Sequence, residues 1–445
     1  MQRSALALAF LGASVGAIKV DFDSDASIKS GASTIAYGLM KYYNGNETGE
    51  IPGVLPEPYY WWESGALFET LIDYWVQTGD DTYNAVTTQG LLHQVGAEDD
   101  FFPANQSLTI GNDDQGVWAL AAIAAAENGL PGPSKGSPQW LDLAKNVFND
   151  FVARWDTKYC GGGLRWQVLP FNAGYDYKNS ISNAVFFDLA ARLYQQTNNQ
   201  TYSQWATKVF EWEQKAGLIT DSYQVFQGVS TEDCDKVNKV QFSMEAGIFL
   251  HGSAAMYNAT TSAGWKTRLD GLVKSAQTTF FKDSVLFEQA CEGNKLCGRD
   301  QQVYKGFLVR ALKSTTQLAP YTISTIQPLL QSTAKAAATS CAGSPSKGFA
   351  GQPGTACGYS WVGSSAFDGV IGVGEQLNAL SAVASAFSKD VKGSGNNGTS
   401  TGGSTQPSGT GADKPSTTPK NSGNKIGASA MTALVVLGGI MYGLC

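Results

Sequence analysis

Several common signatures are missing from this chain of 445 residues. Histidine occurs only at His93 and His251, and no two cysteines have a C-x-x-C spacing. A cysteine and histidine zinc site, or a serine–histidine–aspartate triad, therefore lacks its parts. The letters G-x-S-x-G occur at 132–136, but a nucleophile elbow needs a preceding strand, and this motif lies between helical segments. We interpret it as a turn.

Basic side chains are neither abundant nor clustered. The chain has 31 Lys and Arg against 38 Asp and Glu, with a formal net charge of −7 and no basic run. Nucleic-acid binding needs a basic patch that meets the phosphates, so we predict no nucleic-acid partner. Neither a Walker loop nor a dinucleotide-binding glycine motif is present, and we predict no cofactor and no metal.

Both ends of the chain have patterns of secretion and anchoring. Residues 1–17 combine Arg3, an apolar run and small residues, which predicts a secretory signal peptide. Residues 426–445 are mostly apolar with no basic residue after them, which favours a removed glycolipid (GPI) anchor signal over a retained transmembrane helix. The Gly-, Ser-, Thr- and Pro-rich stretch 392–425 predicts a linker that holds the attachment region. We therefore expect a folded domain over 18–391, displayed on the plasma membrane or cell wall.

Six cysteines lie between these ends. An even number in a secreted chain indicates disulfides, although six cysteines allow fifteen pairings. Close spacing favours Cys291 with Cys297 and Cys341 with Cys357, and this leaves Cys160 with Cys234. Glycosylation sequons agree with the secretory route; they lie at Asn46, Asn105, Asn199, Asn258 and Asn397.

Helical periodicity dominates the predicted domain, and strand-like alternation is scarce. Apolar residues recur at spacings of three and four, as they do from Ile28 to Tyr43. The pattern predicts about twelve helices, which make six hairpins. They lie near 25–44, 60–78, 81–95, 113–128, 138–155, 179–196, 200–216, 242–258, 262–280, 299–314, 320–338 and 370–389.

Every second predicted helix begins in a similar way. Polar or acidic residues stand close to a glycine, and an apolar run rich in small residues follows. Because a helix that is apolar on most faces is buried, we place these six in an inner ring and the others in an outer ring. This predicts an all-α (α/α)6 barrel, with the inner N-termini gathered around one funnel. The alternative is an irregular helical bundle with ordinary caps.

Two adjacent acids, Asp113 and Asp114, begin the fourth predicted helix and are the best candidates for chemistry. An acid at a helix start is often only a cap. Two carboxyls about 5–5.5 Å apart, however, are what retaining glycoside hydrolysis needs. One attacks the anomeric carbon, while the other donates a proton to the leaving oxygen.

Aromatic and amide side chains lie near the same helix starts. A pyranose ring stacks its C–H face on aromatic rings and offers hydroxyls to acids and amides, so this is the outline of a sugar-binding site. We predict substrate contacts from Trp61, Trp62, Glu63, Asn112, Gln115, Arg165, Trp166, Asn179, Asn183 and Glu245.

Five segments in chain order, 60–67, 112–115, 160–167, 177–183 and 368–376, resemble glycoside hydrolase family 76 in its fungal cell-wall branch, the mannan endo-1,6-α-mannosidase-like proteins. The resemblance implies an (α/α)6 barrel and retaining action on α-1,6-mannosides. It also implies that Asp113 is the nucleophile and Asp114 the acid/base.

For the biological role, the resemblance implies a GPI-anchored transglycosidase. Such an enzyme cuts a mannose-containing glycan, either α-1,6-mannan or the GPI core glycan, and joins anchored wall proteins to a β-glucan acceptor. Residues 241–245 depart from the Trp and Tyr-Asn pair expected in many relatives, which predicts an altered subsite.

Two alternatives stay open. A catalytically silent wall lectin would keep the funnel for binding mannan. An inverting glycosidase on another polysaccharide needs carboxyls about 6.5–9.5 Å apart, so the second acid would be distant in sequence. Its candidates are Glu63, Glu245 and Asp368.

Overall fold

The computed structural model describes residues 17–363 and 366–387. Apart from Ala17, the predicted signal peptide lies outside these residues, as do the predicted linker and tail. Among the residues described, no helix combines the length and the apolarity that a membrane crossing requires.

The described part of the chain forms twelve α-helices, as the apolar spacing predicted. The inner helices are α2 (Trp61–Thr78), α4 (Asn112–Glu127), α6 (Ser180–Thr197), α8 (Ser243–Thr260), α10 (Gln301–Leu318) and α12 (Val373–Ala384). The outer helices are α1 (Asp25–Met40), α3 (Asn84–His93), α5 (Trp140–Arg154), α7 (Gln200–Lys215), α9 (Ala263–Phe280) and α11 (Ile323–Ser340). A short 3-10 helix, Pro320–Thr322, precedes α11.

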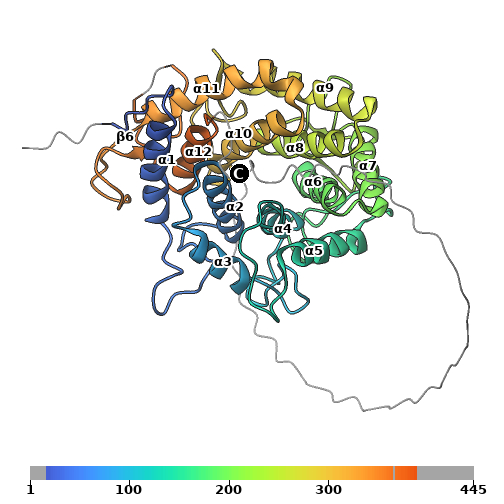
Figure 1. The fold of residues 1–445 in the computed structure, drawn as a ribbon. Helices are drawn as coiled ribbons and strands as arrows, with labels where there is room; N and C mark the ends of the chain where they lie inside the picture. Colours follow the sequence, from blue (N-terminus) through green and yellow to red (C-terminus); the bar gives the residue numbers. More distant parts are fainter. Residues whose placement is uncertain (1–16, 364–365, 388–445) are drawn as a thin grey trace, which may run out of the picture. The chain divides into compact units, whose positions relative to one another are not determined.

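The inner helices form a closed ring. Each packs against the next in the order α2, α4, α6, α8, α10, α12, and α12 packs back against α2 (Figure 1). The outer helices cover this ring: α3, α5, α7 and α9 pack on α2, α4, α6 and α8, while α1 and α11 pack on α12. The prediction of an (α/α)6 barrel is therefore confirmed.

The difference between the two rings follows from side-chain size and periodicity. Helix α4 is buried along most of its length and rich in alanine, so neighbouring helices approach it on several sides. In α8, a Cβ at Gly247 would lie 2.8 Å from the Cα of Leu308, so only glycine allows this approach. Outer helix α5 instead buries one stripe, which includes Leu143, Val147 and Phe151.

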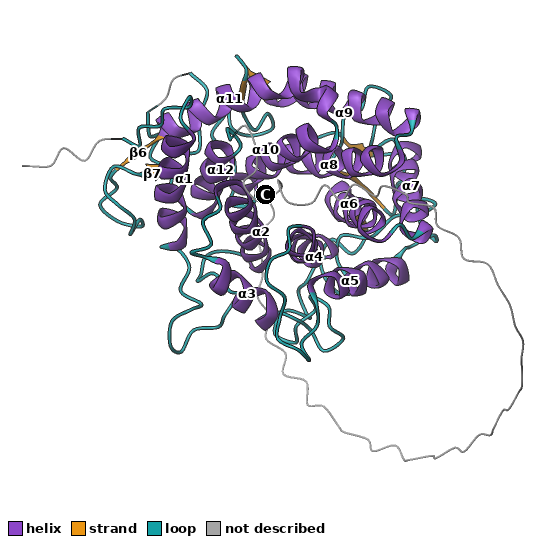
Figure 2. Ribbon diagram, viewed as in Figure 1, coloured by secondary structure: helices purple, strands orange, loops and turns teal. Residues whose placement is uncertain are grey.

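Short strands occupy only loops between helices (Figure 2). The antiparallel sheet β1-β2-β3 joins β1 (Tyr177–Asn179), β2 (Gly228–Ser230) and β3 (Val237–Asn238). Two hairpins complete the set: β4 (Phe281–Lys282) pairs with β5 (Val285–Leu286), and β6 (Cys341–Gly343) pairs with β7 (Ala356–Cys357). Strand β1 runs directly into α6, so it sets where that helix begins.

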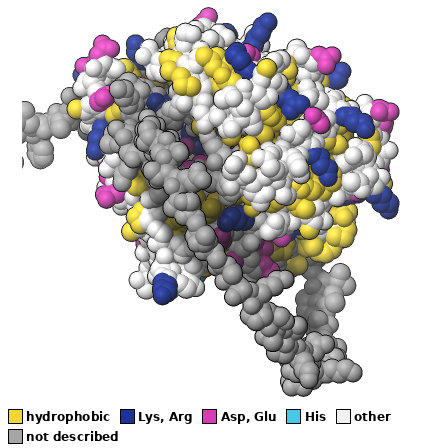
Figure 3. All heavy atoms as spheres, turned by 45° about the vertical axis from the view of Figure 1, so that its right-hand side comes forward, with side chains coloured by type: hydrophobic (Ala, Val, Ile, Leu, Met, Phe, Trp, Pro, Cys, Tyr) yellow, Lys and Arg dark blue, Asp and Glu magenta, His cyan; other side chains and the backbone are white. Residues whose placement is uncertain are grey.

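All three favoured disulfides are confirmed. Cys291 bonds Cys297, Cys341 bonds Cys357, and Cys160 bonds Cys234. The last bond ties the loop before β1 to the loop after β2. On the face shown in Figure 3, basic and acidic side chains are interspersed, with no broad patch of one sign.

Candidate active site

The first turns of five of the six inner helices line a cavity of about 830 Å³. Its lining comes from the starts of α2, α4, α6, α8 and α10 and from the loops that precede them. Seven residues predicted as site residues line it: Trp61, Trp62, Asp113, Asp114, Trp166, Asn179 and Glu245. Residues far apart in the sequence therefore meet in this cavity. Trp62 and Asp300, for example, are hydrogen-bonded and lie 238 positions apart.

Asp113 and Asp114 lie in the first turn of α4 and have different partners. The Oδ2 of Asp113 accepts a hydrogen bond from Asn179 Nδ2 at 3.0 Å, and its Oδ1 accepts one from the Asp114 amide at 3.0 Å. The Oδ2 of Asp114 accepts from the Gly111 amide at 2.7 Å. Both side chains keep partial exposure to the cavity. The two carboxyls are thus held separately, and both can meet a ligand.

Burial raises the pKa of both aspartates. For Asp113 the charge of Asp114 adds to the effect of burial, and the Asn179 amide opposes it. For Asp114 burial raises the pKa to about 7, against the Gly111 hydrogen bond and with a further contribution from Asp300. The two groups titrate as a pair, so near neutral pH the pair can hold one proton and one negative charge. This is the charge state that an acid and a nucleophile need.

The loop before β1 holds the start of α4. The Asn112 amide donates to the Trp166 carbonyl at 2.8 Å, and Gly111 pairs with Gln167. The Trp166 ring is partly exposed and lines the cavity. The same loop therefore places an aromatic surface beside the aspartates.

Lys178 fixes the glycine run of this loop. Its buried ammonium donates to the carbonyls of Asp156 and Tyr159 at 2.7 and 2.6 Å, and also to Gly162. Gly163 has φ +93° and lies so close to the Trp212 ring that a Cβ would overlap it. The close backbone approach explains why glycine is required here.

Two predicted contacts, Glu63 and Arg165, do not line the cavity. The buried Glu63 carboxylate accepts from the Tyr60 amide at 2.5 Å and caps α2. Arg165 donates to the Tyr175 carbonyl at 2.6 Å and pairs with Asp156 at 2.8 Å. Both support the loops that carry the aromatic lining.

Three further predicted contacts, Asn112, Gln115 and Asn183, are also buried behind the cavity wall. Asn183 bonds both the amide and the carbonyl of Leu164, at 2.8 and 3.2 Å. Asn112 donates to the Arg165 carbonyl at 2.9 Å. The side chains of these three residues form hydrogen bonds with other parts of the protein, so they support the cavity wall and do not line it.

Several lining residues were not predicted as site residues. They include Tyr60, Tyr177, Phe242, Asp300, Gln301 and Tyr304. Asp300 stands just before α10, and its Oδ1 accepts from Trp62 Nε1 at 3.1 Å. An acid at the start of an inner helix is the pattern that identified Asp113, so the same criterion would have found Asp300.

Of the three acids considered as the second acid of an inverting mechanism, only Glu245 is among the residues that line the cavity. Glu245 lines the cavity, and burial raises its pKa to about 7. Asp368 instead accepts from the amides of Tyr359, Ser360 and Val370 in a turn before α12. Across the described ranges, no group of three acidic, histidine or cysteine side chains is arranged to hold a metal ion.

The helical barrel brings adjacent aspartates and aromatic side chains into one cavity, an arrangement that fits a glycoside hydrolase. The model of Glycosyl hydrolase family 76 matches residues 27–397, and the chain belongs to this family. The enzyme is therefore a glycoside hydrolase.

Two fungal relatives match most of this chain. Mannan endo-1,6-alpha-mannosidase DCW1 of Saccharomyces cerevisiae is 42% identical over 94% of this chain and 93% of its own. The crystal structure of Dfg5 from Chaetomium thermophilum in complex with glucosamine has a TM-score of 0.79 and 43% identity, over 82% of this chain and 92% of that one.

A bacterial relative shares the fold. An inactive variant of the alpha-1,6-mannanase GH76A of Salegentibacter, in complex with alpha-1,6-mannotriose, has a TM-score of 0.62 over 81% of this chain and 98% of that chain. Its sequence identity is 18%, so the likeness concerns the fold alone.

Proposed function

We propose that this protein is a retaining glycosidase or transglycosidase that acts on α-1,6-mannosidic linkages. The observation that carries the proposal is the pair Asp113 and Asp114, which accept from Asn179 and Gly111 respectively and line one cavity together with aromatic side chains. A retaining mechanism needs two carboxyls about 5–5.5 Å apart, one ionised and one protonated.

In the proposed mechanism Asp113 attacks the anomeric carbon, and Asp114 donates its proton to the leaving oxygen. A covalent mannosyl–Asp113 ester results. Asp114 then accepts a proton from water or from a sugar hydroxyl, whose oxygen displaces Asp113. The hydrogen bond from Asn179 and the amide dipoles at the start of α4 stabilise the anionic form of Asp113, whereas burial and the charge of Asp114 raise its pKa. The mechanism therefore requires that the proton rests on Asp114 when Asp113 attacks.

The relatives support the proposed substrate class. They include a mannan endo-1,6-alpha-mannosidase and a Dfg5 whose crystal structure is a complex with glucosamine. We therefore propose α-1,6-mannan or the GPI core glycan as donor, since the latter joins mannose to glucosamine. Trp61, Trp62, Trp166, Asn179 and Glu245 line the cavity and are our proposed substrate contacts.

The biological part of the proposal concerns acceptor and location. A sugar hydroxyl of β-glucan would take the place of water, which would join anchored mannoproteins to the wall. The apolar segment 426–445 and the signal-like segment 1–17 support a GPI-anchored protein at the plasma membrane or cell wall.

The test is to incubate the purified protein with a fluorescent α-1,6-mannoside or core glycan, with and without a β-glucan acceptor. The Asp113→Asn variant is assayed in parallel, and Asp142→Asn, an exposed acid of α5, is the matched control. Label joined to glucan by the wild type and the control, but not by Asp113→Asn, is the expected result.

Each other outcome has a defined meaning. Shortened glycan without transfer makes the protein a hydrolase, while binding without any product makes it a lectin. NMR of the first product gives the anomeric configuration, and inversion would point to Glu245 as the partner of one aspartate.

A further inference from the structure

The last turn of the outer helix α5 lies against the first turn of α4. Arg154, the final residue of α5, donates from Nη1 to Asn112 Oδ1 at 3.0 Å and to Gln115 Oε1 at 2.5 Å. These two acceptors flank Asp113 and Asp114 in sequence. One guanidinium group thus contacts the residue before the pair and the residue after it.

The contact is part of a closed ring of polar groups. Gln115 Nε2 donates to Asp150 Oδ2 at 2.7 Å, and Arg154 Nη2 lies 3.5 Å from the same oxygen. Asn112 donates onward to the Arg165 carbonyl at 2.9 Å. The other face of the guanidinium covers the Phe102 ring at 5.2 Å. Both side-chain amides are therefore fixed at each of their polar ends.

The start of α4 needs an external support because its own caps are occupied by the proposed chemistry. Its N-cap residue, Gly111, has no side chain with which to cap the helix. The carboxylate that accepts from the Gly111 amide belongs to Asp114, and in the proposed mechanism this group gains and loses a proton in each turnover. A fixed separation of the two carboxyls must therefore come from groups that do not react.

We propose that Arg154 is a positioning residue for the Asp113–Asp114 pair, acting through Asn112 and Gln115. The inference rests on the proposed function. Arg154 is absent from the cavity lining, so it does not act on substrate. Its Nη1 donates to both carbonyl oxygens while its Nη2 faces Asp150 Oδ2 at 3.5 Å, and the single ammonium of lysine cannot reproduce this planar arrangement over two nitrogens.

The experiment compares Arg154→Ala and Arg154→Lys with the wild type in the full-length protein. A shift of the carboxyls by about 1 Å costs on the order of 100-fold in rate, so we expect kcat for mannoside turnover to fall about 10- to 100-fold while KM stays nearly constant. Added guanidinium should restore part of the kcat of Arg154→Ala, and Arg154→Lys should keep its fold but not its rate.

Arg268→Ala is the matched control. Arg268 also lies on an outer helix, α9, pairs with one acid, Glu211, at 3.4 Å, and covers aromatic rings. Its side chain is 20% exposed, against 23% for Arg154. Equal losses of melting temperature and unchanged kcat in both variants would overturn the proposal, as would a rise in KM alone.

A second readout does not depend on turnover. Carbon-13 NMR of aspartate-labelled protein follows the carboxyl titrations of Asp113 and Asp114, assigned with the two Asn variants. We expect the two titration steps to move in Arg154→Lys and to stay unchanged in Arg268→Ala. Unmoved steps would overturn the positioning role, whereas a wild type inactive on mannosides with moved steps would reject only the proposed function.

Discussion

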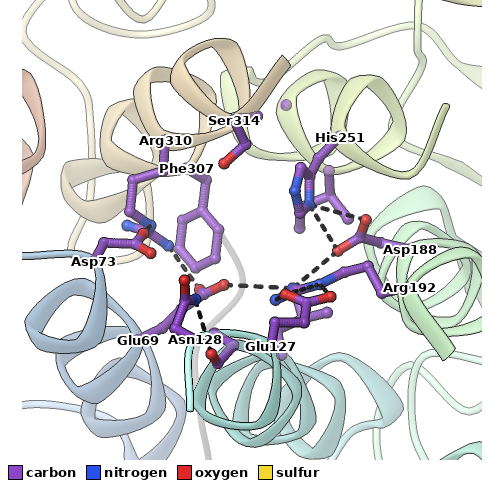
Figure 4. Close-up of a pocket in the computed structure, with 15 residues that line it drawn as sticks. Glu69, Asp73, Glu127, Asn128, Asp188, Arg192, His251, Phe307, Arg310 and Ser314 are labelled. Carbon is purple, nitrogen blue, oxygen red and sulfur yellow. Dashed lines mark hydrogen bonds and ion pairs between the residues drawn. The ribbon is translucent and has the colours of Figure 1, made fainter. Parts of the chain in front are cut away.

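The two ends of the inner ring carry buried acids in contrasting surroundings. At the N-terminal end, the acids of the cavity accept from amides and from an indole, and among the described residues no Lys or Arg forms an ion pair with Asp113, Asp114, Glu245 or Asp300. The other end encloses a smaller cavity of about 70 Å³, where the acids face cations (Figure 4).

This second group is a charge cluster formed by Glu69, Asp73, Glu127, Asp188, Arg192, His251 and Arg310. Arg192 pairs with Glu127 at 2.7 Å and with Asp188 at 3.4 Å. Arg310 pairs with Glu69 at 2.8 Å and with Asp73 at 3.2 Å. Five of the inner helices, α2 to α10, are tied together through it.

We interpret the contrast as a division between the acids that we propose to react and the acids that hold the fold together. Arginine neighbours hold the carboxylates of the cluster in ion pairs, which suits a structural tie. For Asp73, burial still raises the pKa to about 7 against the charge of Arg310. Amide and backbone N–H neighbours leave a carboxyl able to gain and lose a proton, which general acid catalysis needs. The distinction predicts opposite responses to substitution at the two ends.

Of the substitutions that test this contrast, Asp114→Asn in the cavity of about 830 Å³ should have the largest effect. Loss of the proton donor should lower kcat/KM by about 10²–10⁴-fold without unfolding the protein. The loss should be smaller for an aryl mannoside whose leaving group needs no proton. Steady-state kinetics on both substrates check this, and an equal loss on both would contradict the acid/base role.

In the charge cluster, Arg192→Met should chiefly reduce stability. It removes the cation beside the partly buried Glu127 and leaves the buried Asp188 with His251 alone, and breaking a buried pair costs about 3–5 kcal/mol of unfolding free energy. Lys266→Met is the control, because its pair with Asp270 at 2.7 Å is nearly half exposed and is worth about 0.2–1 kcal/mol. Urea unfolding of the three proteins measures the difference.

Asp114→Asn should also stabilise the protein, and more so at alkaline pH. The pKa of Asp114 is raised to about 7, so the stability that its protonated form contributes is lost as pH rises from about 4 through 7. Asparagine has no charge to bury. Melting temperatures at pH 4 and pH 8 should therefore show the larger gain at pH 8, and an equal gain at both would reject the raised pKa.

The smallest effect, of opposite pH dependence, is expected for His251→Gln. Burial lowers the pKa of His251, but the Asp188 carboxylate at 3.0 Å outweighs burial, and the net pKa is raised. The stability from this pair is present below the ordinary histidine pKa and is lost as pH rises through the folded value. Melting curves should show a larger loss for the variant at pH 5 than at pH 8, with turnover unchanged.

Most of the barrel could be predicted from the sequence, because outer helices such as α5 have a spaced apolar stripe and the inner helices have a polar start followed by an apolar run. The sequence does not show which residues at the start of a helix face the cavity. Asn112 and Asp113 are adjacent, yet successive residues point about 100° apart around the axis, so one lies in the wall and the other in the cavity. Asp114 shares the cavity with Asp113 only because its carboxylate turns back to Gly111.

The charge cluster could not be predicted either. Its strongest links join residues on different helices, such as Glu69 with Arg310 and Glu127 with Arg192. Along one helix, the spacing of Asp188 and Arg192 is the ordinary i, i+4 pattern of an exposed pair. Only the ring of helices shows that both are buried.

The closure of that ring through α12 has a consequence for biosynthesis. Gln376 donates at 3.4 Å to the carbonyl of Ile35, which lies 341 positions earlier in the chain. Trp62 donates to Asp300, which lies 238 positions later. Contacts of such long sequence separation form late and slowly. Hairpins can assemble one by one as the chain emerges, but the cavity gains its last wall only when α10 arrives. A nascent chain therefore lacks the complete cavity until α10 has packed against α8.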